Sequence, residues 1–493
     1  MTPQSAIVYP VAQTSRRIYA AIKSQIADGT LCAGSKLPST RAFASEHGVS
    51  RTTVLAVYEQ LAAEGYIETA PGAVAKVAVG ISVESKAPLS TPLRSVDELT
   101  LSAYSRRASQ FDLQVQHHES PARSVINFLY GALSPRDFPT LAWQRAYDSA
   151  LLQRQTELYY ADPQGELDLR VELQGYLRRA RGLSCDADQI LIVNGSQQAI
   201  DLCARVLLNP GDRVVFEEPC YLKAHHVFEA VGAQMCATPV DEQGLITQRL
   251  PKGRCKLAYV TPSHQFPLGG VMPIGRRREL LAWAERSSAW IVEDDYDSEF
   301  RYGLRPVDAL QSVDNAGCVI YVGTFSKALS PQLRIGYLVL PKSLVNIFVQ
   351  AKNLIDRHTP RLEQAALANL IRSGAYERHV RRARRENERR RFVLLGALEK
   401  YMPKNATVQG GASGLHVVVW INNLRADQEA ALVAQANALG VGVRPISAMY
   451  AAGAAHSSQS CAGLVLGYAS LSLDDIDKGI KMLASAVVSS SLH

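Results

Sequence analysis

The sequence predicts a mainly parallel α/β domain that follows a small helix-turn-helix domain. From residue 189 onward, short apolar runs alternate with segments of helical pattern, which is typical of a parallel sheet covered by helices on both faces. Polar turns follow several of these runs. Within the first eighty residues, two short helical patterns are joined by a turn that contains Gly48, and a candidate β-hairpin comes after them.

The composition indicates a folded globular protein with two or three domains. The chain has 493 residues, 47% hydrophobic and 20% charged, which is more than one hydrophobic core usually holds. No apolar run approaches the roughly 20 residues of a membrane span, and the N-terminal residues lack a signal-peptide core. The eight cysteines form no CxxC motif, so we expect a cytoplasmic protein with reduced thiols. The net charge of +7 permits a nucleic-acid partner without requiring one.

Residues 1–80 are predicted to contain three helices and a hairpin. Apolar residues at helical spacing predict the first helix over 15–27. Ser39 is suited to cap a second helix that ends near Glu46, and Ser50 is suited to cap a third that ends at Ala63. Residues 67–69 and 74–79 are then expected to form a two-stranded wing.

The start of the third helix carries candidate contacts to double-stranded DNA. Side-chain donors at this end of a recognition helix reach phosphates and base edges in the major groove, and here they are Ser50, Arg51, Thr52 and Thr53. Lys36 and Arg41 are expected to contact the DNA backbone.

This segment resembles the GntR-type winged helix over its whole length. The matching residues are Gly34, Leu37-Pro38-Ser39, Arg41, Gly48-Val49-Ser50-Arg51, Thr53-Val54, Tyr58, Leu61 and Glu64-Gly65-Tyr66. The wing departs from the family pattern, because residues 71–76 lack its usual hydroxyl groups. Residues 81–122 lose periodicity and are rich in serine, so they are expected to form a linker, with a short helix within 96–109 as an alternative for that part.

The stretch from Val319 to Gly336 contains the most informative motif of the second domain. A buried strand leads into Gly323-Thr324, and Lys327 follows before the next apolar run. Burial lowers the pKa of a lysine, and the neutral amine forms a Schiff base with a carbonyl. Thr324, Ser326 and Arg334 are suited to a phosphate. A Schiff base beside a phosphate site suggests pyridoxal 5′-phosphate; the alternative is a surface loop that happens to contain a lysine.

Strands are expected near 190–194, 213–217, 256–260, 289–294, 319–323 and 335–340. Ligands lie at the carboxyl ends of such strands, and polar turns fall there. Ser196 opens a helix and is suited to a phosphate. Tyr221 either stacks on a flat ring or merely caps a helix, and His264 is either a polar contact or a structural histidine.

Carboxylates follow the fourth of these strands. Asp294 is expected to pair with a pyridinium nitrogen, which keeps the ring protonated, and Asp295 is its rival for that role. Tyr296 is expected to hydrogen-bond the phenolic oxygen of the same ring.

Residues 123–493 resemble the fold-type I aminotransferases through Asp294, Tyr296, Lys327 and Arg334 in this order. Together with the GntR-like segment, the chain is similar to the MocR/GabR family of transcription regulators. The resemblance implies pyridoxal 5′-phosphate on Lys327, a head-to-tail homodimer, and a tyrosine, here Tyr160, that reaches the phosphate of the partner subunit. It also implies phosphate contacts from Ser196, Gln197, Thr324, Ser326 and Arg334.

Two features of the C-terminal third leave alternatives open. The position at which aminotransferases usually place an arginine for the substrate carboxylate resembles Val465 here, and Arg444 is the candidate substitute. Residues 378–391 contain eight arginines, which could form a nucleic-acid stripe or a solvated helix. Residues 346–493 are expected to form most of a small domain, together with 123–165.

The function expected from this resemblance is a DNA-binding regulator that senses an amine, an amino acid or the cofactor through aldimine chemistry at Lys327. The alternative is an active aminotransferase with an attached DNA-binding domain. A third hypothesis, a regulator that no longer uses the cofactor, is disfavoured by the presence of both Lys327 and Asp294.

Overall fold

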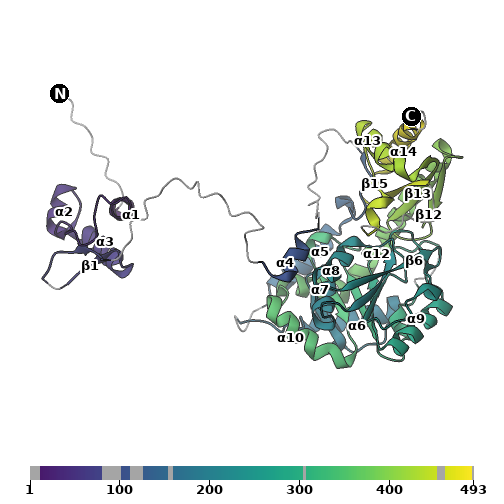
Figure 1. Cartoon of the computed structure of the whole chain (residues 1–493), viewed down its shortest axis with the longest axis horizontal. Coiled ribbons are helices and arrows are strands. Elements are labelled where there is room, and N and C mark those ends of the chain that lie inside the picture. The colour runs from purple at the N-terminus through teal and green to yellow at the C-terminus, as the bar shows by residue number, and fades with distance from the viewer. Residues whose placement is uncertain are drawn as a thin grey trace. The chain divides into compact units, whose positions relative to one another are not determined.

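A computed structural model describes residues 11–70, 72–79, 101–111, 126–153, 159–303, 307–451 and 461–490, without the side chains of 11–13. Contacts divide the chain into two units, Met1–Thr100 and Leu101–His493, drawn in Figure 1. Among the described residues, no helix is long and apolar enough to cross a membrane.

The first unit contains the three predicted helices and the hairpin. The helices are α1 (Val11–Ala27), α2 (Thr40–Glu46) and α3 (Arg51–Ala63), and the strands β1 (Ile67–Glu68) and β2 (Lys76–Val77) pair antiparallel. Both predicted caps are confirmed, because Ser39 accepts from the Ala42 amide and Ser50 from the Thr53 amide. The core between them is apolar and includes Ile22, Ile26, Val54, Val57, Leu61, Ile67 and Val77.

The predicted linker, 81–122, contains a short helix that packs on the second unit. This helix, α4 (Ala103–Ala108), confirms the expectation of helix within 96–109. Arg107 Nε donates to the Ala230 carbonyl at 2.8 Å, and the Phe111 ring stacks on His226 with centroids 4.4 Å apart. Residues 101–111 therefore belong to the second unit and are not a free tether, whereas 80–100 and 112–125 lie outside the described residues.

An eight-stranded sheet forms the centre of the second unit (Figure 1), in the order β4-β11-β10-β9-β8-β5-β6-β7. Neighbours from β10 to β6 run parallel, while β11 runs antiparallel to both β10 and β4. The strands are β4 (Ile190–Val193), β5 (Arg213–Glu218), β6 (Gln234–Asp241), β7 (Gly244–Leu245), β8 (Leu257–Val260), β9 (Trp290–Asp295), β10 (Val319–Thr324) and β11 (Gly336–Val339).

The six strands expected from the sequence are all present in this sheet. The last two strands of the sheet, β6 and β7, are not predicted, because β6 reads Gln-Met-Cys-Ala-Thr-Pro-Val-Asp and is mostly half-exposed, without the continuous apolar run of a central strand. Helices cover the sheet: α5 (Thr140–Leu151), α6 (Leu167–Arg181), α7 (Ser196–Leu207), α8 (Leu222–Ala230), α9 (Ile274–Ser287), α10 (Val345–Asp356) and α11 (Arg361–Arg372).

The second unit also contains a smaller domain, which has its own hydrophobic core. Its antiparallel sheet has the order β12-β13-β16-β15, and β3 pairs separately with β14. The elements are β3 (Ile126–Asn127), β12 (Ala406–Gln409), β13 (His416–Arg425), α13 (Glu429–Ala438), β14 (Val441–Gly442), β15 (Arg444–Pro445), β16 (Cys461–Gly467) and α14 (Leu473–Ser490).

The predicted extent of the small domain is partly wrong. The core of this domain combines Ile126 and Phe128 with residues from Leu394 to Val487, as expected for a domain made of two distant segments. The helices α10 and α11 and the first turns of α12 (Ala375–Tyr401) instead pack into the cores of the large domain. The long α12 therefore belongs to the large domain at its start and to the small domain at its end.

The arginines of α12 mostly join this helix to neighbouring segments. Arg384 donates to the Glu299 carbonyl, Arg390 binds Asp137 and the Leu471 carbonyl, and Arg391 donates to the Gly411 carbonyl. Arg378 and Arg382 also donate to backbone carbonyls. Because these guanidinium groups are engaged within the protein, a nucleic-acid stripe along α12 is disfavoured.

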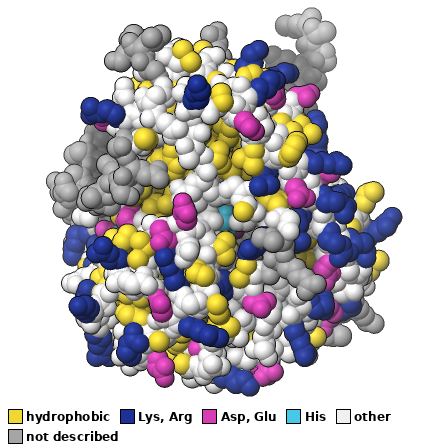
Figure 2. Space-filling view, turned by 90° about the vertical axis from the view of Figure 1, so that its right-hand side faces the viewer, with side chains coloured by type: hydrophobic (Ala, Val, Ile, Leu, Met, Phe, Trp, Pro, Cys, Tyr) yellow, Lys and Arg dark blue, Asp and Glu magenta, His cyan; other side chains and the backbone are white. Residues whose placement is uncertain are grey.

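On the face shown in Figure 2, charged side chains of both signs are interspersed and apolar side chains gather in a hollow in the upper half.

Candidate functional site

Lys327 follows β10 and lies in a buried environment. Burial lowers the pKa of its ammonium from 10.5 to about 8, although the charges of Asp297 and Asp294 oppose this effect. Its Nζ lies 4.8 Å from the centroid of the Tyr130 ring. Gly131 leaves room for the amine, since a Cβ there would stand 2.8 Å from Nζ. Lys327 therefore loses its proton to become a neutral nucleophile at a lower pH than an exposed lysine does.

Asp294 lies near the end of β9, on the strand next to β10. Val322 is its register partner, five residues before Lys327. The Tyr259 hydroxyl donates to Oδ2 of Asp294, whereas the buried Oδ1 has no hydrogen-bond partner among the described residues. Burial raises the pKa of this carboxyl to about 7. A buried carboxylate oxygen without a partner is costly, so this position is suited to a cationic N–H donor.

Asp295, the rival of Asp294, already has partners. Arg181 Nε donates to its Oδ2 at 2.6 Å, Ser298 donates to the same oxygen at 3.0 Å, and the Tyr321 hydroxyl also donates to it. Arg181 and Asp295 are both buried. Because this carboxylate is neutralised within the protein, the geometry favours Asp294 as the group that is left for a ligand.

His264 and Tyr296 belong to one buried network. The Nδ1 of His264 lies 3.0 Å from both carboxylate oxygens of Asp297 and 2.9 Å from the Tyr296 hydroxyl. Its Nε2 is buried and finds no partner in the part of the chain that the structure describes. The hydroxyl of Tyr296, for which we expect a contact to a cofactor oxygen, thus also forms a hydrogen bond with His264.

The turn at 194–198, called the anion turn below, connects β4 to α7. Gly195 has φ of 79°, and a Cβ there would stand 2.7 Å from Arg334 Nη2, so only glycine fits under the guanidinium. Arg334 itself donates to the Asn194 carbonyl at 3.0 Å. Ser196 and Gln197 begin α7, where free amides favour an anion.

Thr324 and Ser326 form a second polar turn that follows β10. Thr324 Oγ1 donates to Ser326 Oγ at 2.9 Å and accepts from the Ser326 amide at 3.1 Å. Beside the anion turn lies a cavity of about 390 Å³, with Asn194 and Arg334 in its wall. Its other lining residues are Trp143, Tyr147, Gln332, Leu333, Ile335, Thr359, Pro360 and Glu363.

An apolar cluster packs against Tyr130, whose ring lies beside Lys327. It includes Phe266, Trp420, Met449 and Val465, and Tyr130, Tyr221 and Tyr296 pack on it. Tyr221 lies just before α8, with its ring edge-on to Phe266 at 5.9 Å, and burial raises the pKa of its hydroxyl to about 12. Its side chain forms no capping hydrogen bond, so the helix-cap alternative is not supported by a side-chain contact.

Arg444 lies on β15 directly opposite Val465 on β16. Paired residues of antiparallel strands point to the same face, so Arg444 projects toward the side of the sheet on which Val465 packs with Phe266. The guanidinium is half-buried and has no hydrogen-bond or ion-pair partner within the described ranges, and burial lowers its pKa. This arginine is thus available to an anion, whereas Val465 is fully buried.

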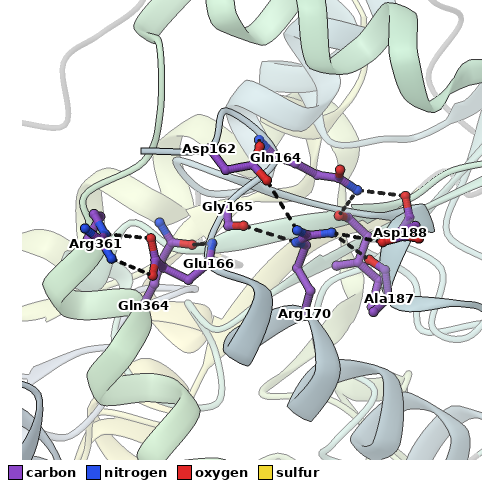
Figure 3. A network of polar contacts seen from close by, with 10 residues as sticks. Asp162, Gln164, Gly165, Glu166, Arg170, Ala187, Asp188, Arg361 and Gln364 are labelled. Atoms are coloured by element: carbon purple, nitrogen blue, oxygen red, sulfur yellow. Dashed lines mark hydrogen bonds and ion pairs between the residues drawn. The ribbon is translucent and has the colours of Figure 1, made fainter. Parts of the chain in front are cut away.

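Tyr160 is exposed, and the segment that follows it is firmly held. Figure 3 shows Arg170 between Asp162 and Gly165 on one side and Ala187 and Asp188 on the other. At the other end, Arg361 pairs with Glu166 at 2.7 Å, and Gln364 accepts from the Glu166 amide. The side chain of Tyr160 itself, 58% exposed, contacts only Arg357, His358 and Tyr159 among the described rings and cations.

The residues predicted to contact DNA differ in how exposed their side chains are. Lys36, Arg41, Ser50, Arg51 and Thr52 are exposed, as contacts to DNA require. Thr53 is 7% exposed, and its hydroxyl lies 2.7 Å from Ser50 Oγ. We correct this assignment, because Thr53 contributes to the helix cap and its side chain is not presented at the surface.

Several residues of the site were not identified from the sequence. Asp297 holds His264, Tyr259 donates to Asp294, Arg181 neutralises Asp295, and Tyr130 lies under Lys327. Asp297 carried a signal, since it continues the acidic run after β9. Tyr130 and Arg181 carried none, because their contacts depend on segments far away in the chain.

Comparisons with known proteins identify both units. The family "Aminotransferase class I and II" matches residues 125–480, and "Bacterial regulatory proteins, gntR family" matches residues 14–77. A probable rhizopine catabolism regulatory protein, MocR, from Rhizobium meliloti is 35% identical over 96% of this chain and 93% of its own. The chain belongs to the MocR-type transcriptional regulators with an aminotransferase class I and II domain. Its first unit is a DNA-binding GntR-type winged helix.

Two further proteins bear on the second unit of this regulator. The pyridoxine biosynthesis regulator PdxR from Corynebacterium glutamicum is 32% identical over 81% of both chains. The crystal structure of kynurenine aminotransferase from Pyrococcus horikoshii, solved with PMP, aligns with a TM-score of 0.69 and 29% identity over 80% of this chain and 96% of that chain. The second unit therefore has the aminotransferase fold.

Proposed function

We propose that this regulator holds pyridoxal 5′-phosphate at Lys327 and changes its binding to operator DNA when a small amine, an amino acid or the cofactor itself occupies the site. The observation that supports this most directly is the pair formed by a buried lysine with a pKa of about 8 and a buried Asp294 oxygen without a partner in the described chain. Neither feature stabilises the protein without a ligand, because both place a titratable group in an apolar environment.

The described residues fit this cofactor at both of its ends. The unpartnered Oδ1 of Asp294 would accept from the protonated ring nitrogen, which relieves the cost of its burial. Arg334, which lies over Gly195, would hold the phosphate together with Ser196 and Gln197 at the start of α7 and with Thr324 and Ser326. When bound, the cofactor supplies an aldehyde that condenses with amines and a ring that withdraws electrons.

Lys327 has two functions in this proposal. As a neutral amine it attaches the cofactor, and once an incoming amine takes its place it is free to accept a proton near neutral pH. Tyr130 and Gly131 lie next to this amine, and the glycine leaves it room. A ligand alters DNA binding only if it favours one conformation of the protein, so its contacts with the residues of the site must differ between the two conformations.

Arg444 indicates which class of effector the site is suited to bind. Because this arginine has no partner within the described ranges and projects on the same side as Val465, it is suited to the carboxylate of an amino acid. The neighbouring cluster of Phe266, Met449 and Val465 would contact apolar groups of the same ligand. We therefore place amino acids with apolar side chains first among the effectors to be tested, before simple amines.

We further propose a cytoplasmic head-to-tail homodimer. Tyr160 is exposed on a segment fixed by Arg170 and Arg361, and the cavity beside the anion turn is bounded by Asn194 and Arg334. A tyrosine of a second copy entering this cavity would complete the phosphate site. This unit also exposes apolar residues that a second copy could cover: Leu151, Leu152, Tyr159, Leu354 and Ile355.

An active aminotransferase is the second candidate, and the same Lys327 and Asp294 support it. The distinguishing quantity is multiple turnover. A regulator requires only that the ligand displaces Lys327, whereas an enzyme must also complete proton transfer and release product. The absence of an arginine at Val465 favours capture of the ligand over turnover.

The experiment combines a screen with a DNA-binding assay. Amines, apolar and acidic amino acids and free cofactor are added to the purified protein while the visible band of the bound cofactor is followed. Each compound that shifts the band is then tested for an effect on operator affinity. We expect at least one compound to change both. Repeated turnover without any change in operator affinity would support the enzyme instead, and an absence of cofactor binding would refute both candidates.

A further inference from the structure

We propose that an ion pair at the end of α10, between the buried Lys352 and the partly buried Asp356, positions the anion turn and thereby sets the affinity for the phosphate of the ligand. This inference rests on the proposed function, because it concerns the phosphate end of the same site. Both residues lie behind the turn rather than in the site, so they are positioning residues.

Asp356 is joined to the anion turn by two hydrogen bonds. Its Oδ2 accepts from Asn194 Nδ2 and from Gln198 Nε2, both at 2.7 Å. Gln198 closes the arrangement, since its Oε1 accepts from the Asn194 amide at 2.7 Å. One carboxylate oxygen therefore fixes the residues on either side of Gly195, the glycine over which Arg334 lies.

Lys352 neutralises Asp356, so this carboxylate can lie close to a bound anion without repelling it. Its side chain is fully buried, and Nζ donates to the other oxygen of Asp356, Oδ1, at 2.8 Å. A carboxylate without a counter-charge so close to a phosphate would repel it. Neutralised by Lys352, Asp356 orders the turn through its two hydrogen bonds without adding net negative charge behind it.

The location of the pair argues against a purely structural role. Burying a lysine is costly, and burial indeed lowers the pKa of Lys352, so a pair serving only to hold α10 could be replaced by apolar residues. The carboxylate instead uses its second oxygen entirely for the anion turn. The next residue, Arg357, leaves the helix at φ of 63° and lies 4.1 Å from the Tyr160 ring centroid, so the same helix end also contacts the proposed dimer segment.

The test compares ligands with and without the phosphate. The dissociation constants of pyridoxal 5′-phosphate and of pyridoxal are measured at equilibrium for wild type and for Asp356→Asn in the full chain, with inorganic phosphate as a competitor. We expect the dissociation constant of the phosphorylated ligand to rise about tenfold, as for one lost charge-assisted hydrogen bond, while that of pyridoxal changes less than about twofold. Inorganic phosphate should compete less well against the variant.

Two further variants keep the test decisive. Gln198→Met removes a hydrogen bond to Asp356 without disturbing the buried pair, and it should reproduce the phosphate-specific loss even if Asp356→Asn folds poorly. Asp201→Asn is the matched control, because Asp201 pairs with Arg205 on the surface of the same helix α7 and should leave both constants unchanged.

The outcomes separate this inference from the proposed function. Equal losses for both ligands, or no loss for either, would overturn the positioning role. If wild type binds neither pyridoxal 5′-phosphate nor pyridoxal, the proposed function fails instead.

Discussion

Replacing Lys327 by methionine should stabilise the protein without cofactor, because the buried ammonium is costly to hold. Its pKa falls from 10.5 to about 8 on folding, which corresponds to a penalty of about 3 kcal/mol in the free energy of unfolding at pH 7. The attraction of Asp294 and Asp297 is already contained in this net shift. Methionine keeps most of the apolar stem and removes the charge, so Lys327→Met should recover much of this free energy.

The sign and pH range of the effect follow from the direction of the shift. Below pH 8 the lysine is protonated in both folded and unfolded chains, so the penalty is present in full. As pH rises from 8 toward 10.5, the folded chain loses its proton first and the penalty declines. The advantage of Lys327→Met should therefore be largest at pH 7 and shrink steadily above pH 8.

The measurement is the melting temperature of wild type and variant, both freed of cofactor, at several pH values between 7 and 9.5. Lys252→Met is the control, because Lys252 is exposed and its replacement should produce no such pH-dependent difference. Lower stability of Lys327→Met than of wild type at pH 7, or an advantage that does not depend on pH, would show that Lys327 is not a buried lysine with a lowered pKa in solution.

Three other predictions concern DNA binding, assembly and signal transfer. Arg51→Ala should weaken operator binding and lower the salt slope by about one unit without unfolding the winged helix, as measured by binding over a salt series; an unchanged slope would exclude a phosphate contact. Tyr160→Phe should weaken cofactor binding in a protein that remains dimeric by light scattering, and wild-type affinity would argue against the shared site. Phe111→Ala should loosen α4 from His226 and α8, so the operator response to ligand should fall while cofactor affinity stays the same.

The sequence predicted most of what local pattern determines. The caps at Ser39 and Ser50, the six apolar strands and the start of α7 at Ser196 all depend on neighbours in the chain, and the structure has them where they were expected. The strand β6 is not predicted because a half-exposed strand near the end of a sheet needs no apolar run.

The side-chain roles that the sequence does not predict depend on contacts with residues far away in the chain. Asp294 and Asp295 are adjacent and chemically identical, and only the position of Arg181, more than a hundred residues earlier, shows which carboxylate is already neutralised. The same limit applies to Thr53: its position at the helix start predicts a DNA contact, but the side chain is buried and its hydroxyl lies beside Ser50 Oγ. The role of Asp356 behind the anion turn had no local signal at all.

The central claim, that ligand control of DNA binding passes through Lys327, is tested most directly by operator affinity. Wild type and Lys327→Ala are compared with and without a compound that shifts the cofactor band of wild type. We predict equal basal affinities, because Arg41 and Arg51 lie in a separate unit, and a response to the compound in wild type alone. A variant that responds as fully as wild type would contradict the claim.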